Sequence, residues 1–149
     1  MRRLVYVFFV LLCLCGCQQK NEFEIKFESI QTQTFQKESQ YLNTELKVIE
    51  ISEDLYRYQV IINEPNANLD DINAFVVCDQ MIGETVASIG FYDENKFNLY
   101  LDKINAENGY YEGVSLMGLA GEKGMTCKLY ISFYKDNRFV EEYIELRSE

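Results

Sequence analysis

The sequence predicts an all-β fold, an antiparallel β-sandwich whose default arrangement is immunoglobulin-like, with at most one or two short helices. Apolar and polar residues alternate along many short segments, which is typical of half-buried strands. Polar turn residues separate these segments at short intervals. About eight or nine short strands at this spacing are typical of a sandwich, and a small antiparallel barrel is the alternative.

The C-terminal segment shows the clearest hairpin pattern. Apolar residues alternate with polar ones over 127–134 and again over 140–146, although Glu142 falls on the apolar side. Residues 135–138 lie between the two runs and are all polar, which is the composition and length of a hairpin turn. We therefore expect a β-hairpin at the C-terminus.

A second hairpin is predicted upstream. Residues 46–51 and 55–62 flank a polar turn at 52–54, and the return strand ends at the turn sequence of residues 64–66, which contains the only proline. Further strands are expected at 74–78, 87–91, 97–101 and 111–119.

The first part of the domain is predicted to be strand and loop. Phe23, Ile25 and Phe27 alternate with charged residues, which predicts an amphipathic strand. Residues 34–45 fit either a helix or a strand with a loop, and the surrounding strand patterns favour the second interpretation. A short helix is also expected to begin near Asn68.

The N-terminus has the features of a secretory signal. Arg2 and Arg3 are positively charged, and residues 4–14 form an almost unbroken apolar run. A membrane-spanning helix needs about 20 apolar residues. The run is shorter than that, and polar residues 18–22 follow it closely. The segment therefore indicates export and not a permanent span.

The end of this segment resembles the lipobox of bacterial lipoproteins. The residues are Leu14-Cys15-Gly16-Cys17, with a leucine three places before a cysteine and a glycine directly before it. The resemblance implies cleavage before Cys17 and attachment of a diacylglyceryl group to its thiol. Two acyl chains anchor a protein stably, where one is marginal. Cleavage by another peptidase and release as a secreted protein is the alternative.

Lipidation at Cys17 defines the domain organisation and the location. Residues 1–16 are the signal peptide, 17–22 the lipidated cysteine with a short tether, and 23–149 a single β-sandwich domain. The domain is then expected on the extracytoplasmic face of the cell membrane. The composition favours a Gram-positive host, and in a Gram-negative host Gln18 would permit sorting to the outer membrane, by resemblance to the same class.

The charge and the residue types exclude several functions. Removal of residues 1–16 leaves 12 basic and 24 acidic side chains, a net charge of −12, which disfavours nucleic-acid binding. The chain contains no histidine, so the usual general base and the commonest zinc ligand are missing. We predict no catalytic residue, no cofactor and no metal site, and we expect that the protein is not an enzyme.

Two cysteines, Cys78 and Cys127, lie in predicted strands of the folded part. Exported proteins meet oxidising surroundings, so a disulfide between them is allowed, and it would join the two sheets of an immunoglobulin-like sandwich. The other interpretation is two buried free thiols that act as small apolar side chains.

Three tyrosines, Tyr130, Tyr134 and Tyr143, are predicted on the outward face of the C-terminal hairpin. An exposed strip of tyrosines is suited to partner contact, because each ring supplies area and a polar tip. Alternatively, the rings stabilise the sheet across strands, or the second face of the sheet is also buried.

Taken together, these features predict a membrane-anchored binding or accessory domain. Its membrane contact is the lipid on Cys17, and its partner would be an envelope protein or a surface ligand. The alternatives are a phage or plasmid exclusion or immunity lipoprotein, and an envelope hydrolase that uses carboxylates.

Overall fold

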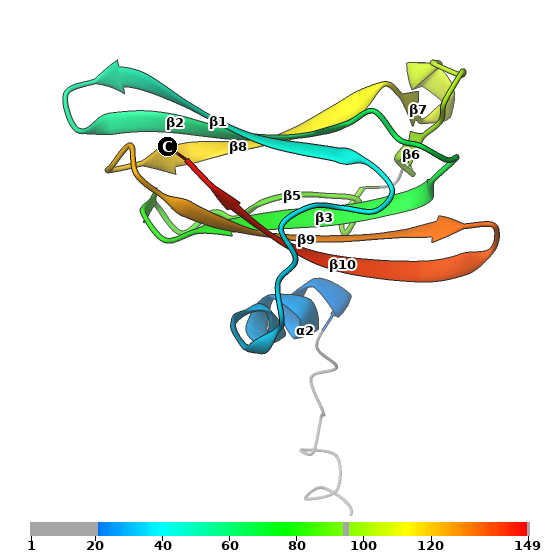
Figure 1. The fold of residues 1–149 in the computed structure, drawn as a ribbon, viewed down its shortest axis with the longest axis horizontal. Coiled ribbons are helices and arrows are strands. Elements are labelled where there is room, and N and C mark those ends of the chain that lie inside the picture. Colours follow the sequence, from blue (N-terminus) through cyan, green and yellow to red (C-terminus); the bar gives the residue numbers. More distant parts are fainter. Residues whose placement is uncertain (1–20, 94–95, 149) are drawn as a thin grey trace, which may run out of the picture.

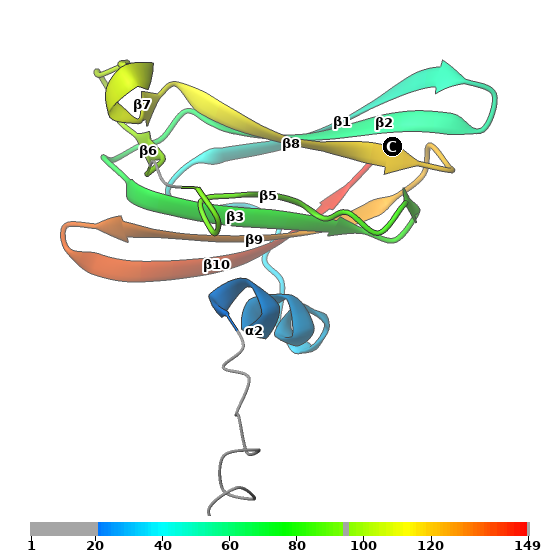
Figure 2. The ribbon, with the colours of Figure 1, turned by 180° about the vertical axis from the view of Figure 1, so that it is seen from behind.

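The computed structural model describes residues 21–93 and 96–148 and shows a two-layer antiparallel β-sandwich (Figures 1 and 2). We call the layers sheet A, with the order β10-β9-β3-β5, and sheet B, with the order β1-β2-β8-β4. The strands of sheet B are β1 (Asn43–Ser52), β2 (Leu55–Asn63), β8 (Gly113–Ala120) and β4 (Met81–Ile82). The strands of sheet A are β10 (Arg138–Arg147), β9 (Thr126–Lys135), β3 (Asp70–Cys78) and β5 (Ala87–Ile89). The predicted all-β sandwich is confirmed.

The strand order is that of an immunoglobulin-like sandwich. In that fold one sheet has the order A-B-E-D, and strands C, F and G form the other. β1-β2-β8-β4 follows the first order, and β10-β9-β3 follows the order G-F-C, with β5 added at the edge. Along the chain β3 is followed by β4, which belongs to sheet B, and then by β5, which belongs to sheet A.

Both predicted hairpins form. β1 and β2 pair from Asn43 opposite Asn63 to Ser52 opposite Leu55. β9 and β10 are joined by Asp136 and Asn137, which both have positive φ angles, 51° and 60°. Two consecutive residues in this region form the turn whose twist matches the flanking strands, and Asp and Asn are among the residues that adopt it.

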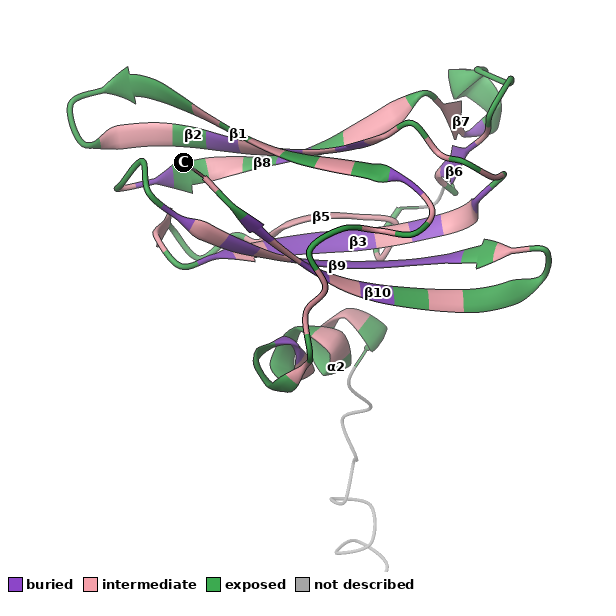
Figure 3. Ribbon diagram, in the orientation of Figure 1, coloured by how far each residue is buried: buried purple, intermediate pink, exposed green. Residues whose placement is uncertain are grey.

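The core lies between the two sheets, where inward-facing side chains from both are buried (Figure 3). Tyr58 of β2 is buried there, and its partner across the strands is Gly118 of β8. A Cβ atom on Gly118 would lie 2.3 Å from the hydroxyl oxygen of Tyr58. Gly118 is therefore needed to make room for the ring within the strand.

Residues 22–29 form a helix, so the strand predicted for Phe23, Ile25 and Phe27 is wrong. The helix α2 (Glu22–Ser29) is followed by the 3₁₀ turn η1 (Ile30–Thr32). The side chain of Asn21 accepts a hydrogen bond from the backbone N–H of Glu24, and the carboxylate of Glu24 accepts one from the N–H of Asn21. This capping box satisfies free donors at the helix start and favours the helix over a strand.

The helix covers the outer face of sheet A (Figures 1 and 2). The ring of Phe23 contacts Phe75 at 5.2 Å and Phe91 at 5.3 Å between ring centroids. Phe75 and Ile30 are buried in this second apolar cluster. Sheet A is thus covered on both faces, which explains the continuous apolar run in its central strand β3.

A connecting segment closes the edge of sheet A. Gln36 pairs with β10 through two backbone hydrogen bonds of 2.9 Å, to Tyr143 and from Glu145. The buried carboxylate of Glu142 accepts hydrogen bonds from the side chain of Ser39 and from the backbone N–H of Gln40. These bonds explain the acid on the apolar side of β10, and they cover an edge strand that would otherwise be open.

Two further expectations for local structure can be compared with the fold. Residues 34–45 contain no helix: residues 34–42 form an irregular, bent connection and residues 43–45 begin β1, in agreement with the strand-and-loop interpretation. The helix expected near Asn68 is wrong, because β3 begins at Asp70. Within residues 21–93 and 96–148, no helix is long and apolar enough to cross a membrane.

Candidate functional site

A segment of irregular structure, residues 96–112, rises over one end of sheet B, and we call it the excursion (Figure 1). It contains β6 (Asn98–Leu99), the 3₁₀ turn η2 (Ala106–Asn108) and β7 (Tyr110–Tyr111). β6 and β7 pair in parallel, and β7 leads almost directly into β8. The excursion therefore forms a wall at the end of the sheet.

Asn98 fixes the base of the excursion. Its buried side chain accepts a hydrogen bond of 3.0 Å from the backbone N–H of Asp71 and donates one of 3.0 Å to the carbonyl of Gly109. Gly109 has a φ of 74°, and a Cβ atom there would lie 2.2 Å from the carbonyl oxygen of Lys96. Only glycine meets both conditions without strain, so the base is held in one geometry.

Tyr100 fixes the side of the excursion. Its hydroxyl group donates a 2.6 Å hydrogen bond to the carboxylate of Asp70 in β3. This hydrogen bond, with burial and the charge of Asp70, raises the pKa of Tyr100 from 10.0 to about 12. The ring packs edge-on against Tyr110 at 4.8 Å between centroids, and the ammonium group of Lys103 lies 3.4 Å from the centroid of Tyr110.

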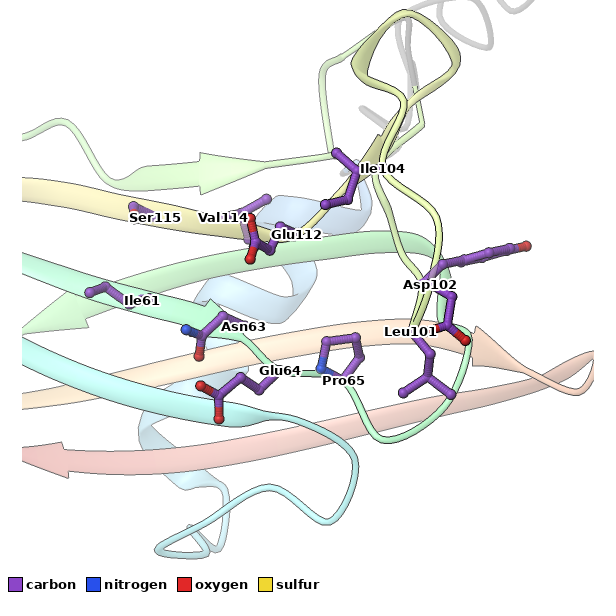
Figure 4. A pocket seen from close by; sticks show the side chains of 12 residues that line it. Ile61, Asn63, Glu64, Pro65, Leu101, Asp102, Ile104, Glu112, Val114 and Ser115 are labelled. Carbon is purple, nitrogen blue, oxygen red and sulfur yellow. The ribbon is translucent and has the colours of Figure 1, made fainter.

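An open groove of about 700 Å³ lies between the excursion and the end of sheet B (Figure 4). Its walls come from the end of β2, the start of β8 and the excursion. The lining residues are Ile61, Asn63, Glu64, Pro65, Tyr100, Leu101, Asp102, Ile104, Glu112, Gly113, Val114 and Ser115.

The groove combines apolar side chains with negative charge. Leu101 and Ile104 are 56% and 67% exposed and line the same hollow. Three lining residues are carboxylates, Glu64, Asp102 and Glu112, and no lining residue is basic. This surface is therefore suited to a ligand that carries both apolar and cationic groups.

Glu64 adopts an uncommon backbone conformation. Its φ is 48°, in the left-handed region, which costs a residue with a side chain about 1–2 kcal/mol. Proline follows at position 65 and favours extended backbone at the residue before it. The conformation places an acidic side chain in the wall of the groove.

The outer face of sheet B continues from the groove and is not covered by any described element (Figures 1 and 2). Strands β1, β4 and β8 place large apolar side chains on this face, and these side chains are 40–54% exposed. These residues are Ile49, Ile82, Met117 and Leu119. They share the face with Arg57 and Gln59, as the register of β2 with β1 and β8 shows. The two sheets thus differ, since the outer face of sheet A is covered by α2.

The predicted tyrosine strip is not an exposed surface, and the prediction is wrong for Tyr130. Tyr130 is 0% exposed, because α2 covers its side of sheet A. Its hydroxyl group donates to Glu141 at 3.0 Å, and burial raises the pKa of the tyrosine. Tyr143 is half-buried in the same cluster, and only Tyr134, 43% exposed, keeps an open ring. The alternative interpretation, a second buried face, applies to Tyr130 and Tyr143.

Cys78 and Cys127 form a disulfide in the structure. The two residues lie directly opposite each other on the neighbouring strands β3 and β9. The bond therefore lies within sheet A, and the expected position between the two sheets is wrong. Cys17, the predicted lipid attachment site, lies outside the described residues.

Sequence reasoning missed the groove. The acids of residues 64, 102 and 112 are far apart in the chain, and the fold alone brings them to one place. One local signal was the placement of Leu101 and Ile104, two apolar residues among polar ones at the end of the strand predicted for 97–101 and just after it. Among the described residues, no group of histidine, cysteine, aspartate or glutamate side chains could hold a metal ion.

Comparison of the chain with models of protein families, with curated proteins and with solved structures found no match. A functional proposal therefore depends on the geometry of the groove and on the N-terminal sequence.

Proposed function

We propose that the protein is a membrane-anchored lipoprotein, acylated on Cys17, whose domain binds an envelope partner through the groove. The observation that carries this proposal is a groove with exposed apolar side chains at the end of an uncovered sheet face. Clefts that expose apolar side chains beside a few polar groups are the usual form of binding sites.

The path of the chain favours an outward-facing groove. Asn21 caps α2 and lies four residues after Cys17, so their Cα atoms are at most about 14 Å apart. α2 packs on the outer face of sheet A, whereas the groove lies at sheet B (Figures 1 and 2). A lipid on Cys17 would therefore hold the α2 side near the membrane and leave the groove accessible to other molecules.

The exposure of the three groove carboxylates favours a binding function over a hydrolase function. A glycoside hydrolase needs one carboxylic acid whose pKa is raised, usually by burial. Glu64, Asp102 and Glu112 are all exposed. Exposed carboxylates are suited to contacts with a charged partner, so we favour a binding role over the hydrolase alternative.

The proposal can be tested by crosslinking in intact cells. The full chain would carry the photoreactive amino acid benzoylphenylalanine in place of Ile104 in the groove, and in a second variant in place of Ile51. Ile51 is also an exposed isoleucine, 52% against 67%, and lies by the β1–β2 turn at the opposite end of sheet B. We expect one crosslinked membrane or envelope protein at position 104 and none at position 51. Equal products at the two positions, or none at either, would contradict the proposal.

A further inference from the structure

We propose that the groove binds a basic peptide segment of the partner, with an arginine or lysine side chain between the carboxylates and an apolar neighbour against the aliphatic wall. This inference rests on the proposed function and specifies the chemistry of the partner. It is carried by the charge, the shape and the exposed apolar residues of the groove.

The charge of the groove is not compensated by any residue that the structure describes. Glu64 follows β2, whereas Asp102 and Glu112 belong to the excursion, and all three line the hollow (Figure 4). None of them forms an ion pair with a described residue. The two basic residues nearest to Asp102 in sequence are already engaged. Lys96 pairs with Asp71, and Lys103 lies over the ring of Tyr110. A cation from outside would therefore meet three free carboxylates.

The arrangement favours an organic cation over a metal ion. Calcium and magnesium need several oxygen ligands close around one point, and the described acids form no such group. A guanidinium group presents five N–H donors over a wider area and can bind a carboxylate through two parallel hydrogen bonds. Its weak hydration also suits a site that is partly apolar. Arginine is therefore the better fit of the two basic residues.

The aliphatic side chains of the groove indicate that the cation belongs to a peptide in which an apolar residue lies next to the basic residue. Ile61, Leu101 and Ile104 line the same hollow as the carboxylates. Burial of an exposed aliphatic side chain is favourable in proportion to the apolar surface removed from water. A free small cation would leave these residues in water, whereas a peptide with leucine or a similar residue beside the arginine would cover them.

A second copy of the chain is a poor occupant. The chain has a net charge of −10, and the part after the predicted cleavage site −12. Two copies repel each other at long range, and a basic segment of another protein is attracted. The same charge disfavours nucleic acid and other anionic ligands.

The test is the binding of a defined peptide to the purified full chain in a non-ionic detergent. The probe is a fluorescein-labelled pentapeptide of alternating leucine and arginine, followed by fluorescence anisotropy. The Glu64→Gln/Glu112→Gln variant removes two charges in the groove, and Glu53→Gln/Glu122→Gln removes two in turns at the far end of sheet B. We expect the groove variant to raise the Kd about three- to tenfold and the control variant less than about twofold.

Two further measurements separate the charged and apolar contributions. Replacement of the arginines in the probe by citrulline, which keeps the shape without the charge, should weaken binding at least about threefold at low salt. Ile104→Ser should also weaken binding, with unchanged folding because the residue is 67% exposed. Equal affinity for the citrulline peptide, or equal effects of the two double variants, would overturn the inference. Displacement of the peptide by calcium, with calcium binding lost in the groove variant, would also overturn it in favour of a metal site.

The two proposals fail in different ways. If position 104 captures a protein in cells but the basic peptide does not bind, the groove binds a partner of other chemistry and only this inference is wrong. If the peptide binds and no protein is captured, the groove has the inferred chemistry and the proposed cellular role is wrong.

Discussion

At the scale of single residues, the core places a hydroxyl group where water cannot reach it. Tyr58 is 0% exposed, and its hydroxyl oxygen has no hydrogen-bond partner among the described residues. Burial also raises the pKa of this tyrosine, since the charged form is even less favourable there. An unpaired buried hydroxyl costs free energy and contributes nothing to stability.

Replacement of this hydroxyl group should therefore be harmless. Tyr58→Phe keeps the ring that packs against Gly118 and removes the unpaired polar atom. We expect the free energy of unfolding, measured by urea denaturation, to be unchanged or to rise by no more than about 3 kcal/mol. A loss of more than about 1 kcal/mol would mean that the hydroxyl group has a favourable partner.

The Tyr100 hydroxyl group in the groove wall has the opposite role. Its hydrogen bond to Asp70 raises the pKa of Tyr100 from 10.0 to about 12, so folding favours the protonated form. The stabilisation is complete below pH 10 and is lost as the pH rises toward 12. We expect Tyr100→Phe to be less stable than wild type at about pH 8, with a smaller difference at about pH 11, measured by urea denaturation. A difference that grows with pH would contradict the hydrogen bond.

At the scale of elements, α2 shows how two patterns in one segment compete. Phe23 and Phe27 alternate with charged residues, and together with Ile30 they also follow the i, i+4, i+7 spacing of a helix. The decisive local signal is Asn21 with Glu24 three places later, a capping box that starts a helix. The strands of the two hairpins were predictable because their alternation is not accompanied by such a cap. The position of α2 on sheet A was not predictable, because it depends on contacts between distant residues.

The packing of α2 predicts a difference between its two faces. Phe23 contacts the rings of Phe75, Phe91 and Tyr92, whereas Ile25 is 52% exposed. We expect Phe23→Ser to lower the free energy of unfolding by about 2–4 kcal/mol. The matched control Ile25→Ser should change it by less than about 0.5 kcal/mol. Urea denaturation of both variants is the measurement, and equal effects would mean that α2 does not pack on sheet A.

At the scale of the whole molecule, the sandwich was predictable and the groove was not. Alternation and turn residues are local features, so they predict strands, hairpins and the number of layers. The groove depends on how the excursion folds over sheet B, and this is fixed by the hydrogen bonds of Asn98 with Asp71 of β3 and with Gly109, the residue before β7. The same limit applies to Tyr130, whose burial follows from a helix 100 residues away in the chain. The pairing of Cys78 with Cys127 could be suggested from sequence, but the position of the disulfide within one sheet could not.

The whole account depends on the lipid that would bring this acidic domain to a membrane with its groove facing away. The most direct measurement is mass spectrometry of the N-terminal peptide of the protein isolated from the membrane fraction of its host. We expect this peptide to begin at Cys17 and to carry the mass of a diacylglyceryl group. A peptide that begins at Met1, or one that begins near residue 17 without an acyl group, would contradict the account.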